Sequence, residues 1–228
     1  NEVIDMRNFR WKNLTANWEE RAMFATTAFV LYASLSAVAN AGVTTVEELE
    51  FKRVQLLGSN ELEVTQGDTN LLKIRGDEDD LTPPPFVIQD ETLRLGVTPA
   101  GDQVSDLQFK LTATGLTALM LKGSGDVYVK PLSVGDLLVS VDGSGEVRMF
   151  DIKADELEIR VAGSGAIQAV DVSAGNARLN LKGSGDIQLG KLEADTLKTH
   201  VAGSGDVLLQ DAGSVRHLDV GWMGSGDI

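Results

Sequence analysis

The tripeptide Gly-Ser-Gly recurs six times in this chain at a nearly constant interval. The copies begin at Gly123, Gly143, Gly163, Gly183, Gly203 and Gly224. Successive copies are 20 residues apart, except that the last lies 21 residues after its predecessor. A fixed period of this length is typical of a solenoid, in which each repeat stacks on the one before it. The repeat therefore predicts an architecture, although it identifies no ligand.

Apolar residues alternate with polar ones on both sides of each copy. In one turn, Val139 and Val141 precede the motif, and Val147 and Met149 follow it. This alternation predicts strands with one buried face. A third buried set closes each turn, and it comprises Leu132, Ile152, Val172 and Leu192, then Leu137, Leu157, Ala177 and Leu197. The register predicts a buried column of Val141, Val161, Leu181 and Val201, with Ser140, Arg160, Asn180 and His200 outside.

The glycines mark a corner that is repeated in every turn. We expect this corner to need positive φ or a close backbone approach, because glycine accepts either at little cost. The small serine between the glycines suits the crowding of stacked turns, which lie about 4.8 Å apart. Leu218 keeps the usual six-residue distance to Gly224, so the extra residue of the last interval falls within residues 211–217.

The charge of the chain excludes some partners. The 228 residues carry a formal charge of −14, and the calculated pI is about 4.5. This charge argues against binding nucleic acid or anionic lipid. The absence of cysteine removes disulfides, thiol nucleophiles and thiolate metal sites. A hydrophobic fraction of 43% is enough for a sizeable core.

Residues 1–41 differ from the rest of the chain. Basic residues precede a charge-free run over residues 22–46, and Ala39-Asn40-Ala41 fits the small residues of a signal cleavage site. This pattern predicts a secretory signal. The alternative is a retained apolar helix, because Asn17 and Glu20 resemble a capping box and Gly42 suits a helix end. Residues 22–41 would contact a membrane only if they are not cleaved.

Residues 42–118 continue the strand pattern less regularly, and residues 119–228 form the regular repeat. Leu56-Leu57-Gly58-Ser59-Asn60 looks like a degenerate corner, and Pro83-Pro84-Pro85 breaks any regular element. We interpret residues 42–118 as an irregular N-terminal β part of the same solenoid, serving as its cap or first turns.

An acidic residue follows most of the Gly-Ser-Gly motifs. The column is Asp126, Glu146, Ala166, Asp186, Asp206 and Asp227. Calcium-binding β-rolls need a nine-residue Gly-Gly-x-Gly-x-Asp repeat, whereas here the period is 20 and one member is alanine. We therefore expect no metal site, and interpret the side chains as acceptors of backbone N–H groups within their own corners.

No other motif indicates catalysis or a cofactor. The serines lack a G-x-S-x-G context, and six equivalent serines cannot share one base. His200 and His217 are the only histidines, and we expect both at the surface. An enzyme on such a scaffold would be a polysaccharide lyase or hydrolase. A groove with clustered aromatics and paired carboxylates would favour that alternative.

Several segments resemble a known family. They are FKRVQLLGSNELEVTQGDTNLLKIRGDED, ETLRLGV and LTALMLKGSGDVYV with the turns that follow. Over about residues 46–228, the chain resembles the auto-transporter adhesin family called the head GIN domain. The resemblance implies a right-handed parallel β-helix exported to the periplasm, the outer membrane surface or the extracellular space, and it supplies no catalytic residue.

The expected function is therefore a non-catalytic envelope protein that binds proteins or glycans, or that assembles with itself. A structural subunit of an extracellular filament is the alternative. A β-helix that stops at Ile228 would leave an apolar layer open, with Trp222 and Met223 in its final turn. Either the chain continues, or a second copy packs there as a homo-oligomer through the solenoid ends.

Overall fold

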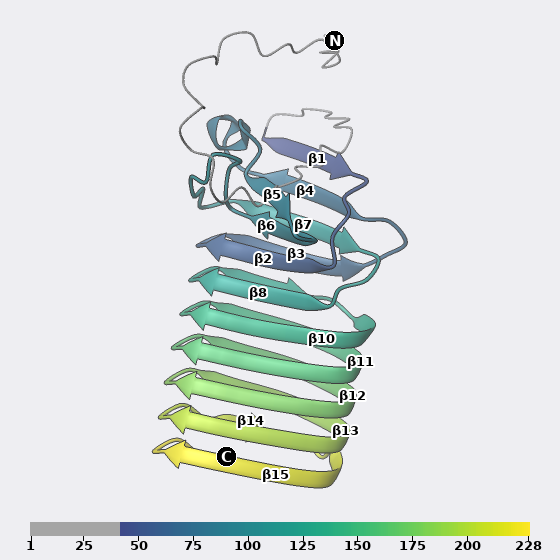
Figure 1. The fold of residues 1–228 in the computed structure, drawn as a ribbon, viewed down its shortest axis with the longest axis vertical. Coiled ribbons are helices and arrows are strands. Elements are labelled where there is room, and N and C mark those ends of the chain that lie inside the picture. Colours follow the sequence, from purple (N-terminus) through teal and green to yellow (C-terminus); the bar gives the residue numbers. More distant parts are fainter. Residues whose placement is uncertain (1–41) are drawn as a thin grey trace, which may run out of the picture.

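The computed structural model describes residues 42–228, which form an all-β solenoid (Figure 1). Strands of successive turns run parallel and pair in register, with Val141 beside Val161 and Val161 beside Leu181. All 15 strands belong to one continuous hydrogen-bonded sheet. The predicted solenoid with a period of about 20 residues is confirmed.

The regular turns consist of strands that bend around the corners of the coil. They are β8 (Ala118–Gly123), β9 (Asp126–Val129), β10 (Leu132–Gly143), β11 (Glu146–Gly163), β12 (Ala166–Gly183), β13 (Asp186–Gly203), β14 (Val207–Leu209) and β15 (Ser214–Gly224). Each full turn has three faces. In the turn that contains Gly143, the first face is residues 138–142, the second is residues 146–149, and the third is residues 152–157.

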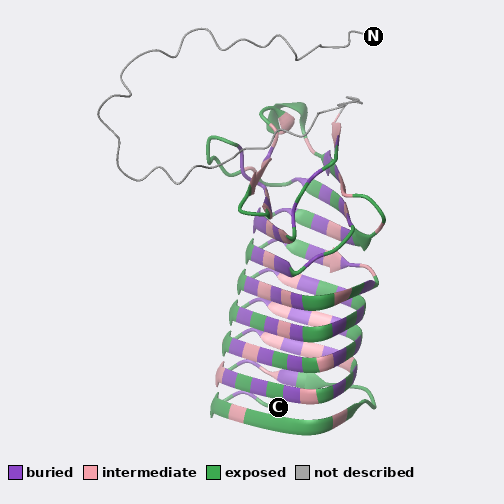
Figure 2. Ribbon diagram, turned by 45° about the vertical axis from the view of Figure 1, so that its right-hand side comes forward, coloured by how far each residue is buried: buried purple, intermediate pink, exposed green. Residues whose placement is uncertain are grey.

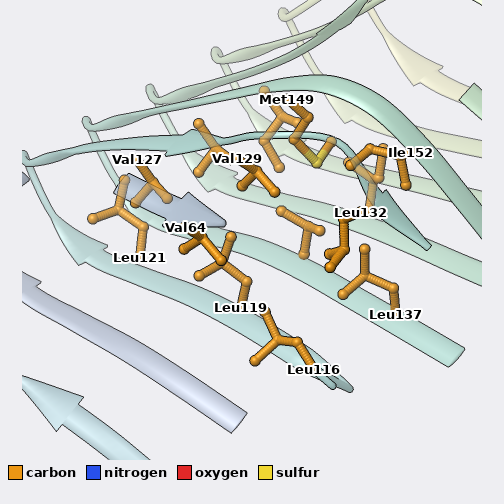
Figure 3. Close-up of a cluster of buried hydrophobic side chains, with 14 of the residues drawn as sticks. Val64, Leu116, Leu119, Leu121, Val127, Val129, Leu132, Leu137, Met149 and Ile152 are labelled. Carbon is orange, nitrogen blue, oxygen red and sulfur yellow. The ribbon is translucent and has the colours of Figure 1, made fainter. Parts of the chain in front are cut away.

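The interior is filled by the apolar side chains of all three faces (Figure 3). Val141, Val161, Leu181 and Val201 are each at most 1% exposed. Their sequence neighbours Ser140, Arg160, Asn180 and His200 are half-buried or exposed. This alternation is confirmed around the regular turns, and Leu209 in β14 is an exception because it is 46% exposed.

The corner requires glycine for both of the expected reasons. Gly163 has a φ of +115°, and a Cβ added there would lie 2.5 Å from the carbonyl oxygen of Gly143. At Gly165 the added Cβ would lie 2.5 Å from the oxygen of Gly145. The oxygen of Gly143 accepts the N–H groups of Ser164 and Gly165, both at 2.9 Å. The backbones of neighbouring corners therefore stack directly, while the serine side chains remain outside.

Residues 42–118 add seven shorter strands. They are β1 (Val43–Glu47), β2 (Arg53–Gly58), β3 (Glu61–Gln66), β4 (Leu71–Arg75), β5 (Phe86–Gln89), β6 (Thr92–Leu95) and β7 (Gln108–Ala113), with a 3-10 turn at Glu78–Leu81. In β2 and β3 the chain forms a complete corner of the stack, and Gly58 lies beside Gly123. The degenerate corner predicted at residues 56–60 is confirmed.

This part of the solenoid is not wound in sequence order. The pair β2–β3 lies between β8–β9 on one side and β6–β7 on the other, all in parallel. The strands β1, β4 and β7 pair antiparallel, as do β5 and β6. Leu49 and Phe51 at this end of the core are buried.

The last turn differs from those before it. Ser214 pairs with Glu193, whereas Leu209 still pairs with Leu189, so the extra residue lies between Leu209 and Ser214. Trp222 continues the column of Val201 but is 55% exposed. The β15 ribbon is accordingly coloured as mostly exposed in Figure 2. Its apolar face is not covered by any described residue.

Candidate functional site

The architecture decides which groups are free to bind a ligand. Strand N–H and C=O groups point along the solenoid axis and pair with neighbouring turns, as between β11 and β12. The side wall therefore offers a ligand its outward side chains. A candidate site lies where these side chains border a hollow.

A shallow groove of about 500 Å³ runs along the corner between the second and third faces. Two rows of outward side chains border it over four turns. One row is Pro131, Asp151, Asp171 and Lys191, and the other is Ser133, Lys153, Ser173 and Glu193. Between the rows lies the column of Leu132, Ile152, Val172 and Leu192, whose side chains are buried. The two rows therefore carry charged groups of both signs, although the surface exposed within the groove is more apolar than polar.

One end of the groove is closed by Gln66 of β3. Its side-chain amide donates to the carbonyl oxygen of Ser133 at 2.9 Å and accepts from the N–H of Ser133 at 2.9 Å. These bonds replace a strand, because β10 pairs with β8 only over the first face and the corner. The third face of the solenoid, and the groove with it, begins at β10.

At the other end, a salt bridge joins the two rows. The Nζ of Lys191 lies 2.6 Å from Oε1 of Glu193. The hydrogen bond from Lys191, together with its charge, lowers the pKa of Glu193 below its usual value. The same hydrogen bond and the charge of Glu193 raise the pKa of Lys191, with a smaller contribution from Asp171. Because the Glu193 pKa is lowered, the pair persists at neutral pH and is lost as pH falls through that value.

Exposed apolar side chains lie beside the groove. Phe150 precedes Asp151 and is 41% exposed, and Val170 in the next turn is 54% exposed. The Nζ of Lys130 lies 5.1 Å from the centre of the Phe150 ring. Large apolar side chains so accessible are rare on the regular turns, so this column adds a contact surface to the charged borders of the groove.

The residues of the groove can be compared with those expected of a carbohydrate-active enzyme. Asp151 and Asp171 are paired in neighbouring turns, and Phe150 supplies one aromatic ring. Both carboxylates are exposed. Glycosidases give two carboxylates different roles by placing one in an apolar environment, which is missing here. Exposed carboxylates of this kind can accept hydrogen bonds from a ligand.

The acidic column lies at a different corner and plays a structural part. Our expectation that each carboxylate bonds within its own corner is wrong for the two bonds observed. Oδ1 of Asp186 accepts the N–H of Asp206 at 3.0 Å, and Oδ1 of Asp206 accepts the N–H of Asp227 at 2.8 Å. These carboxylates therefore link successive turns, because the next N–H in the stack lies within their reach. Within residues 42–228, there is no group of three or more His, Asp or Glu side chains that could hold a metal ion.

A buried polar residue that the sequence did not reveal is Asn60. It occupies the position of the second glycine of the corner motif, equivalent to Gly125, and is 1% exposed. Its amide donates to the oxygens of Leu57 and Val104 and accepts from the N–H of Leu107. Asn60 therefore fixes the loop that follows β6 to the first corner, which is a structural role. Both histidines are exposed, as predicted.

The predicted signal or retained helix of residues 1–41 lies outside the described residues. In the described part of the chain, no helix has the length and apolar character needed to cross a bilayer.

Three solved structures are similar over nearly their whole length. A putative adhesin from Bacteroides fragilis NCTC 9343 shares 22% identity with a TM-score of 0.69, covering 82% of this chain and 94% of that chain. A putative lipid binding protein from Parabacteroides distasonis ATCC 8503 shares 19% identity with a TM-score of 0.53, covering 84% and 98%. A putative adhesin from Parabacteroides merdae ATCC 43184 shares 20% identity with a TM-score of 0.51, covering 81% and 94%. At these identities the likeness shows the fold alone.

The sequence matches none of the curated proteins. Residues 50–228 match the family model described as "Putative auto-transporter adhesin, head GIN domain". The match covers most of the chain and includes both its irregular and its regular turns, so the chain belongs to this head GIN domain family.

Proposed function

We propose that this protein is an exported, non-catalytic adhesin of the cell envelope that binds its ligand through the side wall of the solenoid. The observation that carries the proposal is the groove between Gln66 and Glu193, a hollow in the side wall of the regular turns that is bordered by charged side chains. A repeated wall of side chains provides an extended contact surface, as solenoid proteins commonly do. Family membership supports the adhesin role.

The cellular location and the N-terminus of the native protein test whether it is exported. Cells that produce it should be fractionated, and the N-terminus of the recovered chain determined by mass spectrometry. We expect a mature chain that begins at Gly42, in the periplasm, on the outer membrane surface or in the medium. Recovery of the intact chain from the cytoplasm would contradict export.

Right-handed winding of the coil also stays a prediction, based on the usual hand of connections between parallel strands.

Self-association is a second proposal, and the last turn favours it. Leu218, Trp222 and Met223 of β15 are 64%, 55% and 69% exposed. The opposite end carries the antiparallel strands β1 and β4, and its core residues are buried. In a filament built by head-to-tail stacking, both ends of each solenoid must have an uncovered strand that can pair with a neighbouring copy. A symmetric dimer that pairs two β15 strands needs an uncovered strand at one end only. We therefore favour a closed tail-to-tail dimer over the filament alternative.

Light scattering of the 228-residue chain at micromolar concentration tests this second proposal. The expected result is a dimer that Trp222→Asp and Met223→Asp together convert to a monomer. A wild-type monomer would contradict self-association, and polymers of increasing size would favour the filament.

A further inference from the structure

We propose that the groove between Gln66 and Glu193 binds a neutral, extended oligosaccharide that lies along the solenoid axis. This inference rests on the proposed adhesin function and specifies its ligand class. The carboxylates of Asp151 and Asp171 accept hydrogen bonds from sugar hydroxyls, and Lys153 donates to sugar oxygens. Phe150 and Val170 contact the apolar C–H faces of the sugar rings.

The first argument is the spacing of the polar groups. Asp151, Asp171 and Lys191 occupy the same position in three successive turns. Each turn adds about 4.8 Å along the axis. A sugar ring in an extended chain advances by a similar length, so successive rings meet equivalent positions. The groove spans four turns, from Pro131 to Lys191, which suits about four rings.

The second argument is charge. The lining carries the carboxylates of Asp151, Asp171 and Glu193 and the ammonium groups of Lys153 and Lys191. Opposite signs are interspersed, and Lys191 is already paired with Glu193. A strongly anionic chain would meet Asp151 and Asp171 side by side, and a polycation would meet Lys153. A neutral polyhydroxyl ligand avoids both repulsions while still forming charge-assisted hydrogen bonds.

The third argument concerns the apolar surface. A site for a lipid chain is usually an enclosed apolar cavity, whereas this groove is shallow and is bordered by charged side chains in three of its four turns. Within β10 to β13, the strands that border the groove, the exposed large apolar side chains are Phe150 and Val170, which lie in one column. A shallow groove with charged borders beside one aromatic ring matches a sugar ring, which has hydroxyls at its edge and C–H groups on its faces.

The test measures binding of neutral oligosaccharides to the full 228-residue chain by calorimetry. The probes are cellotetraose, mannotetraose and tetra-N-acetylchitotetraose, with tetragalacturonate as the anionic comparison. We expect at least one neutral probe to bind with a Kd below about 1 mM, and the corresponding disaccharide to bind more weakly. Asp171→Ala should weaken this binding by about tenfold or more, because a charge-assisted hydrogen bond is lost. Phe150→Ala should weaken it about fivefold.

Two matched variants serve as controls for these substitutions. Asp142→Ala removes an exposed carboxylate from the first face, and Leu208→Ala removes an exposed apolar side chain from β14. Neither residue lines the groove, so both variants should bind as the wild type does. The circular dichroism spectrum of each variant is compared with that of the wild type to establish that it folds.

Three outcomes would overturn the inference. They are binding of none of the neutral probes, tighter binding of tetragalacturonate than of any neutral probe, and binding that Asp171→Ala and Phe150→Ala leave unchanged. These results concern the purified protein, whereas the proposed export is decided by cell fractionation. A groove that does not bind sugar would therefore leave the envelope location intact, and a cytoplasmic location would leave the binding result intact.

Discussion

Replacement of Gly165 by alanine is expected to destabilise the solenoid by about 3 kcal/mol or more. The new Cβ would lie 2.5 Å from the carbonyl oxygen of Gly145 and 2.6 Å from Cγ1 of Val141. The oxygen of Gly145 belongs to the backbone and accepts the N–H of Ala166 at 3.1 Å. It can move away only if two turns separate, which lengthens hydrogen bonds on both sides of the corner. Urea unfolding followed by circular dichroism measures the effect.

Two control variants separate this clash from other effects of substitution. Gly135→Ala makes the same chemical change in β10, where an added Cβ would meet only Oδ2 of Asp155, at 3.9 Å. Ser164→Ala alters the exposed residue next to Gly165. Both should change the free energy of unfolding by no more than about 0.5 kcal/mol. If Gly165→Ala were as stable as these controls, the corners could not stack as closely as the structure has them.

Much of the fold could be predicted because the same sequence pattern recurs in each turn, so the assignment of one turn can be checked against the others. The alternation around Gly143 recurs around Gly163 and Gly183, so an error in one turn would have conflicted with the others. The corner glycines were equally predictable. A corner that needs positive φ or a close backbone approach accepts glycine more readily than any residue with a side chain. In the same way, the motif spacing predicted the extra residue within residues 211–217, and the structure has it between Leu209 and Ser214, which overlaps that range.

The N-terminal strands were harder to predict, because they do not follow the repeat. The antiparallel pairing of β1 with β4 and the position of β2–β3 between β6–β7 and β8–β9 depend on contacts between distant segments. Asn60 shows why. Its sequence context suggested only a degenerate corner, whereas its amide bonds Val104 and Leu107 across more than 40 residues. No local periodicity contains that information.

The groove was not predicted either. Its two rows, represented by Asp151 and Lys153, are separated in sequence by a buried residue, and such spacing is shared with ordinary strand faces. Whether two outward columns border a hollow depends on the angle at which the second and third faces meet. The acidic column shows a similar limit, because the sequence could not tell whether Asp186 would bond within its own corner or to Asp206 in the next turn.

From β8 to β13, residues alternate between a dry interior and an outward wall, and the placement of the groove depends on this register. Unfolding of Val161→Asp tests it most directly. Val161 is 1% exposed and lies between Val141 and Leu181, so the new carboxylate would be buried among apolar side chains without a partner. Ala162→Asp is the matched control, because it adds the same charge one residue later at an exposed position between Asp142 and Lys182. We expect Val161→Asp to lose about 4 kcal/mol or more of unfolding free energy, or to be unfolded without denaturant, and Ala162→Asp to unfold as the wild type does. Equal stability of the two variants, or the reverse order, would contradict the register of the wall and with it the placement of the groove.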